Sequence, residues 1–405
     1  MRILLYTYDW MPLVGGIQTI TMFLAKGLAE WPQTHPNEAI EVTLVTETPA
    51  GAMDDSILPF RVVRQPSIGD LIRLVRVANI VHVAGPAFLP MILGLAFRRP
   101  TVVEHHGYQS CCPNGILFFW PDQNPCPEHF MARHYGKCIR CNSGSSGWVK
   151  SFLSMMLTFP RRWLASRVNA NIVPSGHIGH RISLPQTELI YHGVPRPAAP
   201  IPLEASENRG QPPCFAYVGR IIKEKGLQIL LHASHGLAKD GYDFRLKIVG
   251  DGPERCEMER LTEELKLENR TEFISPVSPD RVRDTLIGVT AVTMPSFCEE
   301  VAPLVAIEQM MQGRVIIASD IGGLGEEVDG AGLTFPAGDG HALEACMKQV
   351  LMNPRLAREM GRRAERRASE VFSEERMIQQ HLRLYQALIS SRTRQLPPYK
   401  KVHAL

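Results

Sequence analysis

Two glutamates separated by seven residues form the clearest chemical pattern in this sequence of 405 residues. Glu300 directly follows a predicted strand and turn. Glu308 lies more than one turn inside a predicted helix at residues 303–312, with Pro303 at its start and Gly313 after its end. Because helical side chains lean toward the N-terminus, both carboxylates can face one pocket. Glu308 would accept hydrogen bonds from two ribose hydroxyls there, and Glu300 would face a sugar.

The start of this predicted helix adds a second binding element. The segment Val301-Ala302-Pro303-Leu304 leads into it, and the free N–H groups of the first turn would meet a sugar or a phosphate. An exposed glutamate followed by an ordinary helix is the alternative explanation. The position favours a ligand site, because α/β proteins bind ligands at the carboxyl ends of their parallel strands.

A glycine turn with two basic residues follows a predicted strand in the second half of the chain. Arg220, directly after Gly219, can bind phosphate oxygens through its planar guanidinium, and Lys225 adds a point charge at the same diphosphate. Solvated basic residues at the start of a surface helix would give the same pattern. Gly250 and Gly252 form a tight turn that either approaches a nucleotide closely or serves only as a turn.

The first half of the chain offers a matching pair of weaker signals. Gly15 and Gly16 lie between the first predicted strand and helix, where they would let the backbone approach a diphosphate at a helix N-terminus. His106 follows another strand, and its imidazole would lie at the edge between two domains, near a sugar or an acceptor hydroxyl. A lone histidine is also common as a packing or loop residue.

Five of the nine cysteines fall between Cys111 and Cys141. In a reducing compartment such a cluster indicates a metal or redox site more than disulfides. Four thiolates can close a tetrahedral structural zinc site. Such a site would order this polar insertion and hold one of its loops next to His106, where an acceptor hydroxyl would lie. The predicted ligands are Cys112, Cys126, Cys138 and Cys141, with His129 and His134 in reserve. Free or transiently oxidised thiols are the alternative.

Apolar, strand-like runs alternate with helical patterns along the whole chain, which predicts an α/β protein with two doubly wound parallel sheets. Strands are predicted at 3–8, 42–46, 80–83, 101–104, 215–219, 244–249, 291–294 and 315–318. Helices are predicted at 17–30, 71–77, 227–240, 253–267, 303–312 and 343–352.

This alternation divides the chain into two Rossmann-like domains. The predicted parts are an acceptor-side domain at 1–194 with a Cys-rich insertion at 108–147, a proline-rich linker at 195–212, a nucleotide-sugar-binding domain at 213–372, a helix at 373–390 and a flexible tail at 391–405. Ser373 and two following glutamates suit the start of the last helix, which we expect to pack back on the first domain.

Composition sets limits on the partners. Lysine and arginine total 44 against 41 aspartates and glutamates, and the net charge of +3 gives no general reason to expect nucleic-acid binding. The chain begins with strand-like residues and lacks an apolar run of about 18 residues or more, the length that could cross a bilayer. We therefore expect a cytoplasmic protein.

Together the motifs resemble the retaining glycosyltransferases of family 4, also called glycosyl transferases group 1, which have the GT-B fold. The matching segments are Gly15-Gly16, His106-Gly107, 219–226, 250–253, 300–308 and 320–326. The resemblance covers nearly the whole chain. It implies two Rossmann-like domains facing across a cleft, a nucleotide diphosphate sugar as donor, retention of anomeric configuration, and chemistry that needs no metal cofactor.

The resemblance also implies a role for each candidate residue. Arg220 and Lys225 would hold the diphosphate, Glu308 the ribose, Glu300 the transferred sugar, and His106 the sugar or the acceptor side. Two segments depart from the family pattern: Val301-Ala302-Pro303 replaces a frequent Gly-Phe-Gly, and His192-Gly193-Val194 replaces a common Asn-Gly-Val. The first departure affects which sugar is bound.

The sequence therefore predicts a glycosyltransferase that moves a sugar from a UDP- or GDP-sugar to a glycan, a lipid-linked acceptor or a small molecule. A sugar-nucleotide epimerase or a phosphorylase on the same fold is the nearest alternative. A non-catalytic scaffold is the other, because a fold does not fix a function. The presence of Arg220, Lys225, Glu300 and Glu308 argues against the scaffold.

An apolar, aromatic stretch at Trp148–Leu164, with Arg161 and Arg162 near its end, suggests peripheral contact with the inner face of the membrane. A basic, aromatic helix can lie in a lipid interface and would suit a lipid-linked acceptor. A helix buried in the protein core is the alternative.

Overall fold

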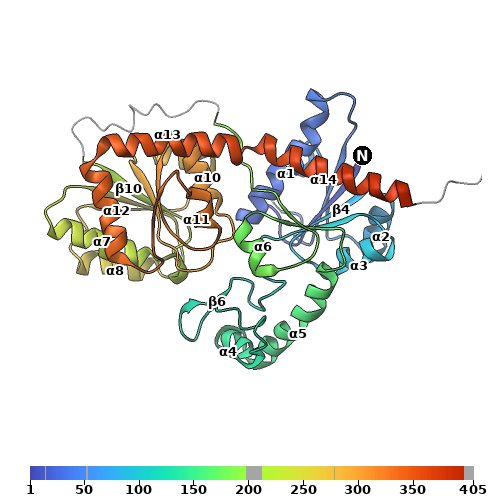
Figure 1. Ribbon diagram of the computed structural model, residues 1–405, viewed down its shortest axis with the longest axis horizontal. Coiled ribbons are helices and arrows are strands. Elements are labelled where there is room, and N and C mark those ends of the chain that lie inside the picture. The colour runs from blue at the N-terminus through green and yellow to red at the C-terminus, as the bar shows by residue number, and fades with distance from the viewer. Residues whose placement is uncertain (14, 52, 198–211, 278, 396–405) are drawn as a thin grey trace, which may run out of the picture.

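The computed structural model describes residues 1–13, 15–51, 53–197, 212–277 and 279–395, arranged as two lobes side by side (Figure 1). Most of the predicted linker, and the last ten residues of the predicted tail, lie outside the described residues. Each lobe contains one parallel sheet with helices packed on it, which confirms the predicted α/β class.

The sheet of the first lobe has seven strands in the order β3-β2-β1-β4-β5-β8-β9. Its elements are β1 (Arg2–Thr7), α1 (Gly16–Thr34), β2 (Glu41–Thr46), β3 (Arg61–Arg64), α2 (Ile68–Val77), β4 (Ile80–Ala84), α3 (Phe88–Ala96), β5 (Thr101–Glu104), β6 (Phe118–Phe119), β7 (Asn124–Pro125), α4 (Tyr135–Ser146), α5 (Trp148–Ala165), β8 (Ala170–Val173), α6 (Gly176–Ile182) and β9 (Thr187–Leu189). The short antiparallel pair of β6 and β7 belongs to the Cys-rich insertion.

The second lobe has six strands in the order β12-β11-β10-β13-β14-β15. Its elements are β10 (Cys214–Val218), the 3₁₀ turn η3 (Lys223–Lys225), α7 (Leu227–Lys239), β11 (Arg245–Val249), α8 (Arg255–Glu264), β12 (Thr271–Ile274), α9 (Pro279–Thr285), β13 (Ala291–Met294), α10 (Leu304–Met311), β14 (Val315–Ser319), α11 (Gly322–Val328), β15 (Leu333–Phe335), α12 (Gly340–Met352) and α13 (Pro354–Val371). Both strand orders reverse beside their first strand, at β1 and at β10, which is where such sheets bind ligands.

Both faces of each sheet are buried, because alternate residues of a strand point to opposite sides. In β1, Ile3 and Leu5 pack into one hydrophobic cluster, and Leu4 and Tyr6 pack into another. Helices α1 and α14 (Glu374–Gln395) cover the first of these faces, and α2 and α3 cover the second. Because both faces are buried, the strands of this sheet are uninterrupted apolar runs in the sequence, which is why they could be predicted.

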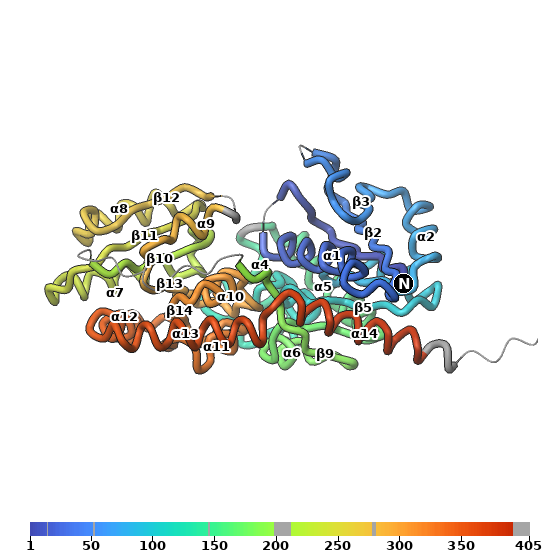
Figure 2. The backbone as a smooth tube through the Cα atoms, turned by 90° about the horizontal axis from the view of Figure 1, so that it is seen from above, coloured from blue at the N-terminus to red at the C-terminus, as the bar shows by residue number. Residues whose placement is uncertain are grey.

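The chain crosses from the second lobe back to the first through α13 and α14, which follow one another along one side of the molecule (Figures 1 and 2). At the crossing, Val194 N–H donates to the Phe372 carbonyl at 2.9 Å, and Glu374 N–H donates to the Val194 carbonyl at 3.1 Å. The side of α14 that carries Ile378 then packs against Gly27 of α1, where a Cβ would collide with the isoleucine. The C-terminal helix is thus part of the first lobe's core.

The structure corrects two sequence-based boundaries. Helix α14 continues to Gln395, so residues 391–395 are helical and do not belong to a loose tail. They include arginine and glutamine, which favour helix, and the first proline comes later, at Pro397. The helix predicted at 253–267 is shorter, at Arg255–Glu264, because Gly252 and Glu254 form the preceding turn.

A buried polar contact joins α14 to the sheet. His82 of β4 lies with Nδ1 2.7 Å from the Tyr385 hydroxyl and Nε2 3.0 Å from a carboxylate oxygen of Glu104. Burial lowers the pKa of His82, so the ring is neutral, donates through Nε2–H to the carboxylate and accepts the tyrosine hydroxyl at Nδ1. The C-terminal helix is therefore held to the sheet by a hydrogen bond as well as by apolar packing.

We expect the Tyr385→Phe substitution to lower the melting temperature by several degrees. Losing the hydroxyl leaves the buried His82 Nδ1 without its partner, at a cost of about 1–3 kcal/mol. The matched control is Tyr242→Phe, whose hydroxyl contacts the Met352 sulfur at 3.6 Å and the Lys348 side chain near the surface. Water can replace these contacts, so the control should leave the melting temperature almost unchanged. Equal shifts for the two variants, measured by calorimetry, would contradict the assignment.

Candidate active site

A cavity of about 650 Å³ lies between the lobes, at the carboxyl ends of strands from both sheets. It is lined by most of the residues predicted to bind a donor or to act in catalysis: Gly15, Gly16, His106, Gly219, Arg220, Lys225, Glu300, Val301, Ala302, Pro303, Leu304 and Glu308. Residues far apart in the sequence therefore meet in one place, with glycines and a histidine from the first lobe facing charged residues from the second.

Glu300 and Lys225 form an ion pair at the centre of the second lobe's side of the cavity. The Ser296 hydroxyl also donates to the Glu300 carboxylate, at 2.6 Å. Burial opposes ionisation of Glu300, but the charge of Lys225 and the two hydrogen bonds hold its pKa below the usual value. A ligand entering the cavity therefore meets an ionised carboxylate and an ammonium group that are already paired.

The loop that carries Arg220 is held by its backbone, so that its side chain stays available. The Tyr217 hydroxyl donates to the Arg220 carbonyl at 2.6 Å, and Arg220 itself is exposed toward the cavity. Gly226 ends the 3₁₀ turn after Lys225 with φ of 73°, and a Cβ there would collide with the Pro295 carbonyl. Only glycine allows this close approach of η3 to the end of β13.

Glu308 lies inside the wall formed by α10. Burial raises the pKa of its carboxyl to about 7. Pro303 directly precedes α10, and Gly313 with φ of 69° follows its end, as the sequence predicted. Because of this geometry, Glu300 stands before the helix and Glu308 inside it, and both reach the same cavity.

The first lobe presents the N-terminus of α1 and two buried histidines. Gly15 occupies the capping position of α1, and a Cβ at Gly16 would meet nothing within 4 Å. His106 and His192 lie with ring centroids 5.4 Å apart, and neither ring makes a hydrogen bond among the described residues. Burial lowers the pKa of both rings, that of His192 to about 3, and both imidazoles face the cavity.

Two predicted donor-binding residues do not line the cavity. Gly250 and Gly252 lie behind the Arg220 loop, where a Cβ would collide with the backbone of Gly219 and of Ile221, respectively. Their lack of a side chain lets two loops pack closely. Contact of these two glycines with the donor stays a prediction, because a tight turn at a strand end has the same sequence whether or not a ligand lies against it.

Sequence reasoning missed Glu299, which joins the two lobes. Its buried carboxylate accepts a hydrogen bond from His177 Nε2 at 2.7 Å and forms an ion pair with Arg181, both on α6 of the first lobe. Glu326 of α11 makes a second connection by accepting the Gly176 N–H at 3.0 Å. The partners lie more than a hundred residues apart, so no local pattern reveals them.

The Cys-rich insertion forms the outer wall of the cavity. Gln109, Gly115 and Ile116 line it, and the Phe118 ring packs edge-on against Phe297 of the second lobe with centroids 5.6 Å apart. The four predicted zinc ligands do not face this cavity. They surround a separate, smaller one inside the insertion, together with His129 but without His134.

Sequence comparison agrees with this geometry. Residues 203–367 match the family model described as glycosyl transferases group 1. A 2-deoxystreptamine glucosyltransferase of Streptomyces kanamyceticus is 34% identical over 164 residues, which cover 39% of this chain and 42% of that protein. A glycogen synthase of Mycobacterium tuberculosis is 25% identical over 396 residues, which cover 92% of this chain and 91% of that protein.

Solved structures support the fold. HepE of Anabaena in complex with UDP superimposes with a TM-score of 0.72 at 17% identity, covering 96% of this chain and 100% of that one. A sucrose-phosphate synthase from Thermosynechococcus elongatus superimposes with a TM-score of 0.70 at 19% identity, covering 96% and 99%. The predicted GT-B fold and the predicted resemblance to group 1 are therefore confirmed.

Proposed function

We propose that this chain, a glycosyltransferase with a group 1 domain at residues 203–367, transfers a sugar from a UDP- or GDP-sugar to an acceptor hydroxyl with retention of configuration. The observation that carries the proposal is the convergence of Arg220, the Lys225–Glu300 pair and Glu308 on one cavity opposite His106. Its volume of about 650 Å³ is in the range for small-molecule sites. The complex of HepE with UDP is consistent with a nucleotide donor.

The charges of the cavity suit a departing diphosphate. Arg220 and Lys225 would neutralise the phosphate oxygens as the bond to the sugar breaks, and the α1 N-terminus at Gly16 would add the free N–H groups of a helix start. Because Lys225 is already paired with Glu300, it is oriented before the donor binds. Charges that are already in place stabilise the charge on the departing diphosphate, and no solvent molecules have to reorient during the reaction.

The remaining walls suit the other parts of the donor. Ionised Glu300 would accept hydrogen bonds from sugar hydroxyls, and Glu308 would accept them from the ribose. Apolar Val277, Val282 and Val305 offer a surface for the nucleobase. The acceptor hydroxyl would approach beside the departing phosphate, on the same face of the sugar, through an oxocarbenium-like state. Retaining glycosidases instead use a nucleophile from a close carboxylate pair.

Helix α5 indicates which kind of acceptor the protein would use. Met155 and Leu164 of this helix are buried, but most of its large apolar residues are exposed: Trp148, Val149, Phe152, Leu153, Met156, Leu157, Phe159 and Trp163. Lys150, Arg161 and Arg167 add positive charge along the helix and just after it, and Ile92 of neighbouring α3 is exposed as well. No helix among the described residues has the length and apolarity to cross a membrane. The observed α5 suits peripheral binding to an anionic lipid surface, and with it a lipid-linked acceptor.

Donor cleavage tests the proposed reaction directly. The purified chain should release nucleotide from one of a panel of UDP- and GDP-sugars when a crude lipid or glycan acceptor is present. We expect Arg220→Ala combined with Lys225→Ala to reduce kcat/KM by about 100-fold or more, because the leaving diphosphate loses both charges.

Lys223→Ala is the matched control, since Lys223 lies on the same 3₁₀ turn without lining the cavity. Near-normal turnover of the folded double variant would refute the assignment. A sugar nucleotide converted without an acceptor would indicate an epimerase.

The pH dependence of nucleotide binding tests Glu308. When the Glu308 carboxyl is protonated, it accepts hydrogen bonds from the ribose less well. Affinity for UDP or GDP should therefore rise as the pH increases toward about 7, by up to about tenfold for each pH unit, and level off above that value. Glu308→Gln should remove this part of the pH dependence and leave the part that comes from the nucleotide's own phosphates. Titration calorimetry between pH values on either side of 7 measures both proteins. Identical profiles would show that Glu308 does not contact the ribose.

Flotation with liposomes tests the membrane surface. Vesicles containing phosphatidylglycerol should carry the chain upward at low salt, and replacing both Trp148 and Trp163 by serine should reduce the floating fraction several-fold. Trp120→Ser is the control, because that exposed tryptophan belongs to the insertion and not to α5. Wild-type protein that stays in the bottom fraction would count against membrane binding.

A further inference from the structure

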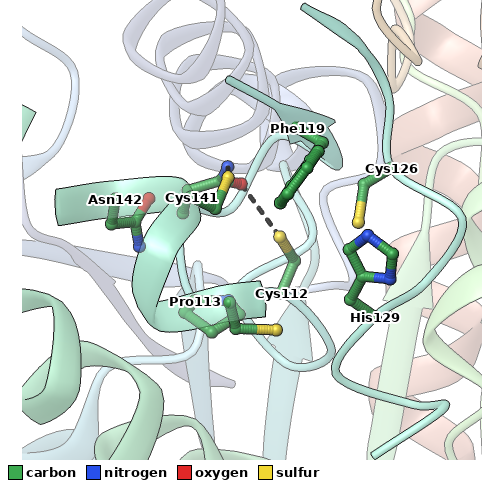
Figure 3. A pocket seen from close by; sticks show the side chains of 9 residues that line it. Cys112, Pro113, Phe119, Cys126, His129, Cys141 and Asn142 are labelled. Carbon is green, nitrogen blue, oxygen red and sulfur yellow. Dashed lines mark hydrogen bonds between the residues drawn. The ribbon is translucent and has the colours of Figure 1, made fainter. Parts of the chain in front are cut away.

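A small cavity inside the insertion gathers sulfur atoms from three separate segments. Its volume is about 10 Å³, and its lining includes Cys112, Cys126, Cys138 and Cys141 together with His129 (Figure 3). This is close to the space that one water-sized sphere occupies. Cys111, although adjacent to Cys112 and buried, does not line the cavity. Four of the five clustered cysteines therefore line the cavity.

The local structure explains how these four side chains come together. Cys138 and Cys141 lie three residues apart on α4, so they share one face of that helix. Cys112 sits in the turn after β5, where its carbonyl accepts the Gly115 N–H at 3.1 Å. Cys126 follows the β6–β7 pair, and its N–H donates to the Leu117 carbonyl at 2.6 Å. A helix, a turn and a hairpin thus line one small cavity, and closing a tetrahedral site would draw their sulfur atoms closer together than they lie here.

The cavity combines apolar packing of the cysteines with a buried ring nitrogen that lacks a hydrogen-bond partner among the described residues. His129 is 6% exposed, and its Nδ1 has no hydrogen-bond partner among the described residues, although it lies beside Cys126 at the cavity (Figure 3). All four cysteines are free and buried. Their polar contacts include a Cys112 thiol that donates to Asn114 Oδ1 at 2.9 Å and a Cys141 thiol that donates to the Phe118 carbonyl at 3.4 Å. Thiols are weak donors, so a soft cation can replace these contacts.

We propose that Cys112, Cys126, Cys138 and Cys141 bind one zinc ion in a structural, four-coordinate site. Four thiolates satisfy the tetrahedral preference of zinc and leave no open position, so the ion takes no part in chemistry. Besides α4 the insertion has only two-residue strands, and metal coordination would add to the order that its buried apolar cluster already supplies.

The site holds the outer wall of the interlobe cavity. Cys112 and Gly115 are joined by a backbone hydrogen bond, and Gly115 in turn accepts the Tyr108 N–H at 2.8 Å. Gly115 and its neighbour Ile116 line the interlobe cavity. Zinc binding would therefore fix the position of a loop that faces the acceptor side. The metal site does not depend on the proposed transferase reaction and can be tested apart from it.

Elemental analysis of the full chain, purified under reducing conditions, should find about one zinc per chain. Cobalt in place of zinc should give the intense thiolate charge-transfer absorption of a sulfur-coordinated ion. Modification of the thiols with a mercurial should release the zinc, which a colorimetric chelator detects even if the variants fold poorly.

The double variant Cys138→Ser with Cys141→Ser should lose the metal, and the matched variants Cys111→Ser and Cys256→Ser should keep it. Cys111 is buried next to a proposed ligand, and Cys256 is exposed far from the site in sequence. Folded wild-type protein with zinc far below one per chain would overturn the proposal. Zinc retained in full by the folded double variant would also overturn it, because the ion would then lie elsewhere.

Discussion

The buried carboxylate of Glu104 is the contact on which the rest of the molecule depends. Four imidazoles surround it: His82 Nε2 lies at 3.0 Å, His192 Nε2 at 3.7 Å, and the Nε2 atoms of His106 and His381 at 3.8 Å. Burial opposes ionisation of this carboxylate, but the imidazoles of His106, His381 and His82 hold its pKa well below the usual range. A buried charge is tolerated only when such partners are present. The cluster therefore joins the sheet, the C-terminal helix and the wall of the cavity in a single unit.

This unit explains how the two lobes keep a common cavity. The helix α14 that supplies His381 is continuous in sequence with α13 of the second lobe, and one hydrophobic cluster contains residues of both sheets and both helices. Near this connection, Glu299 and Glu326 of the second lobe hold α6 of the first. Arg367 of α13 donates to the Glu326 carbonyl at 2.8 Å, so the charged contacts lie beside the hydrophobic ones. Because the Glu299 carboxylate is buried, breaking its contacts with α6 would leave a buried charge without partners.

The parts of the site that could be predicted from sequence are those fixed by local geometry. Glu300 and Glu308 have a spacing that a strand end and one helix impose, and Arg220 and Lys225 follow one turn. His192, Glu104 and Glu299 could not be recognised in the same way, because their partners come from distant strands and helices. Gly250 shows a different case: the turn was recognised, but the sequence does not reveal that the backbone of Gly219 lies against it. The overall fold was easier to predict, because buried parallel strands form uninterrupted apolar runs.

The insertion and α5 connect the cavity to the outer surface of the first lobe. The Ser154 hydroxyl of α5 donates at 2.8 Å to the carbonyl of Pro113, the residue that follows Cys112. The same loop reaches the interlobe cavity at Gly115 and Ile116. A surface that binds the exposed apolar side of α5 would therefore act on a helix joined directly to the cavity wall. Because α4 packs closely along α5 and carries two of the clustered cysteines, the rigidity of the insertion decides how far a displacement of α5 is transmitted to the cavity wall.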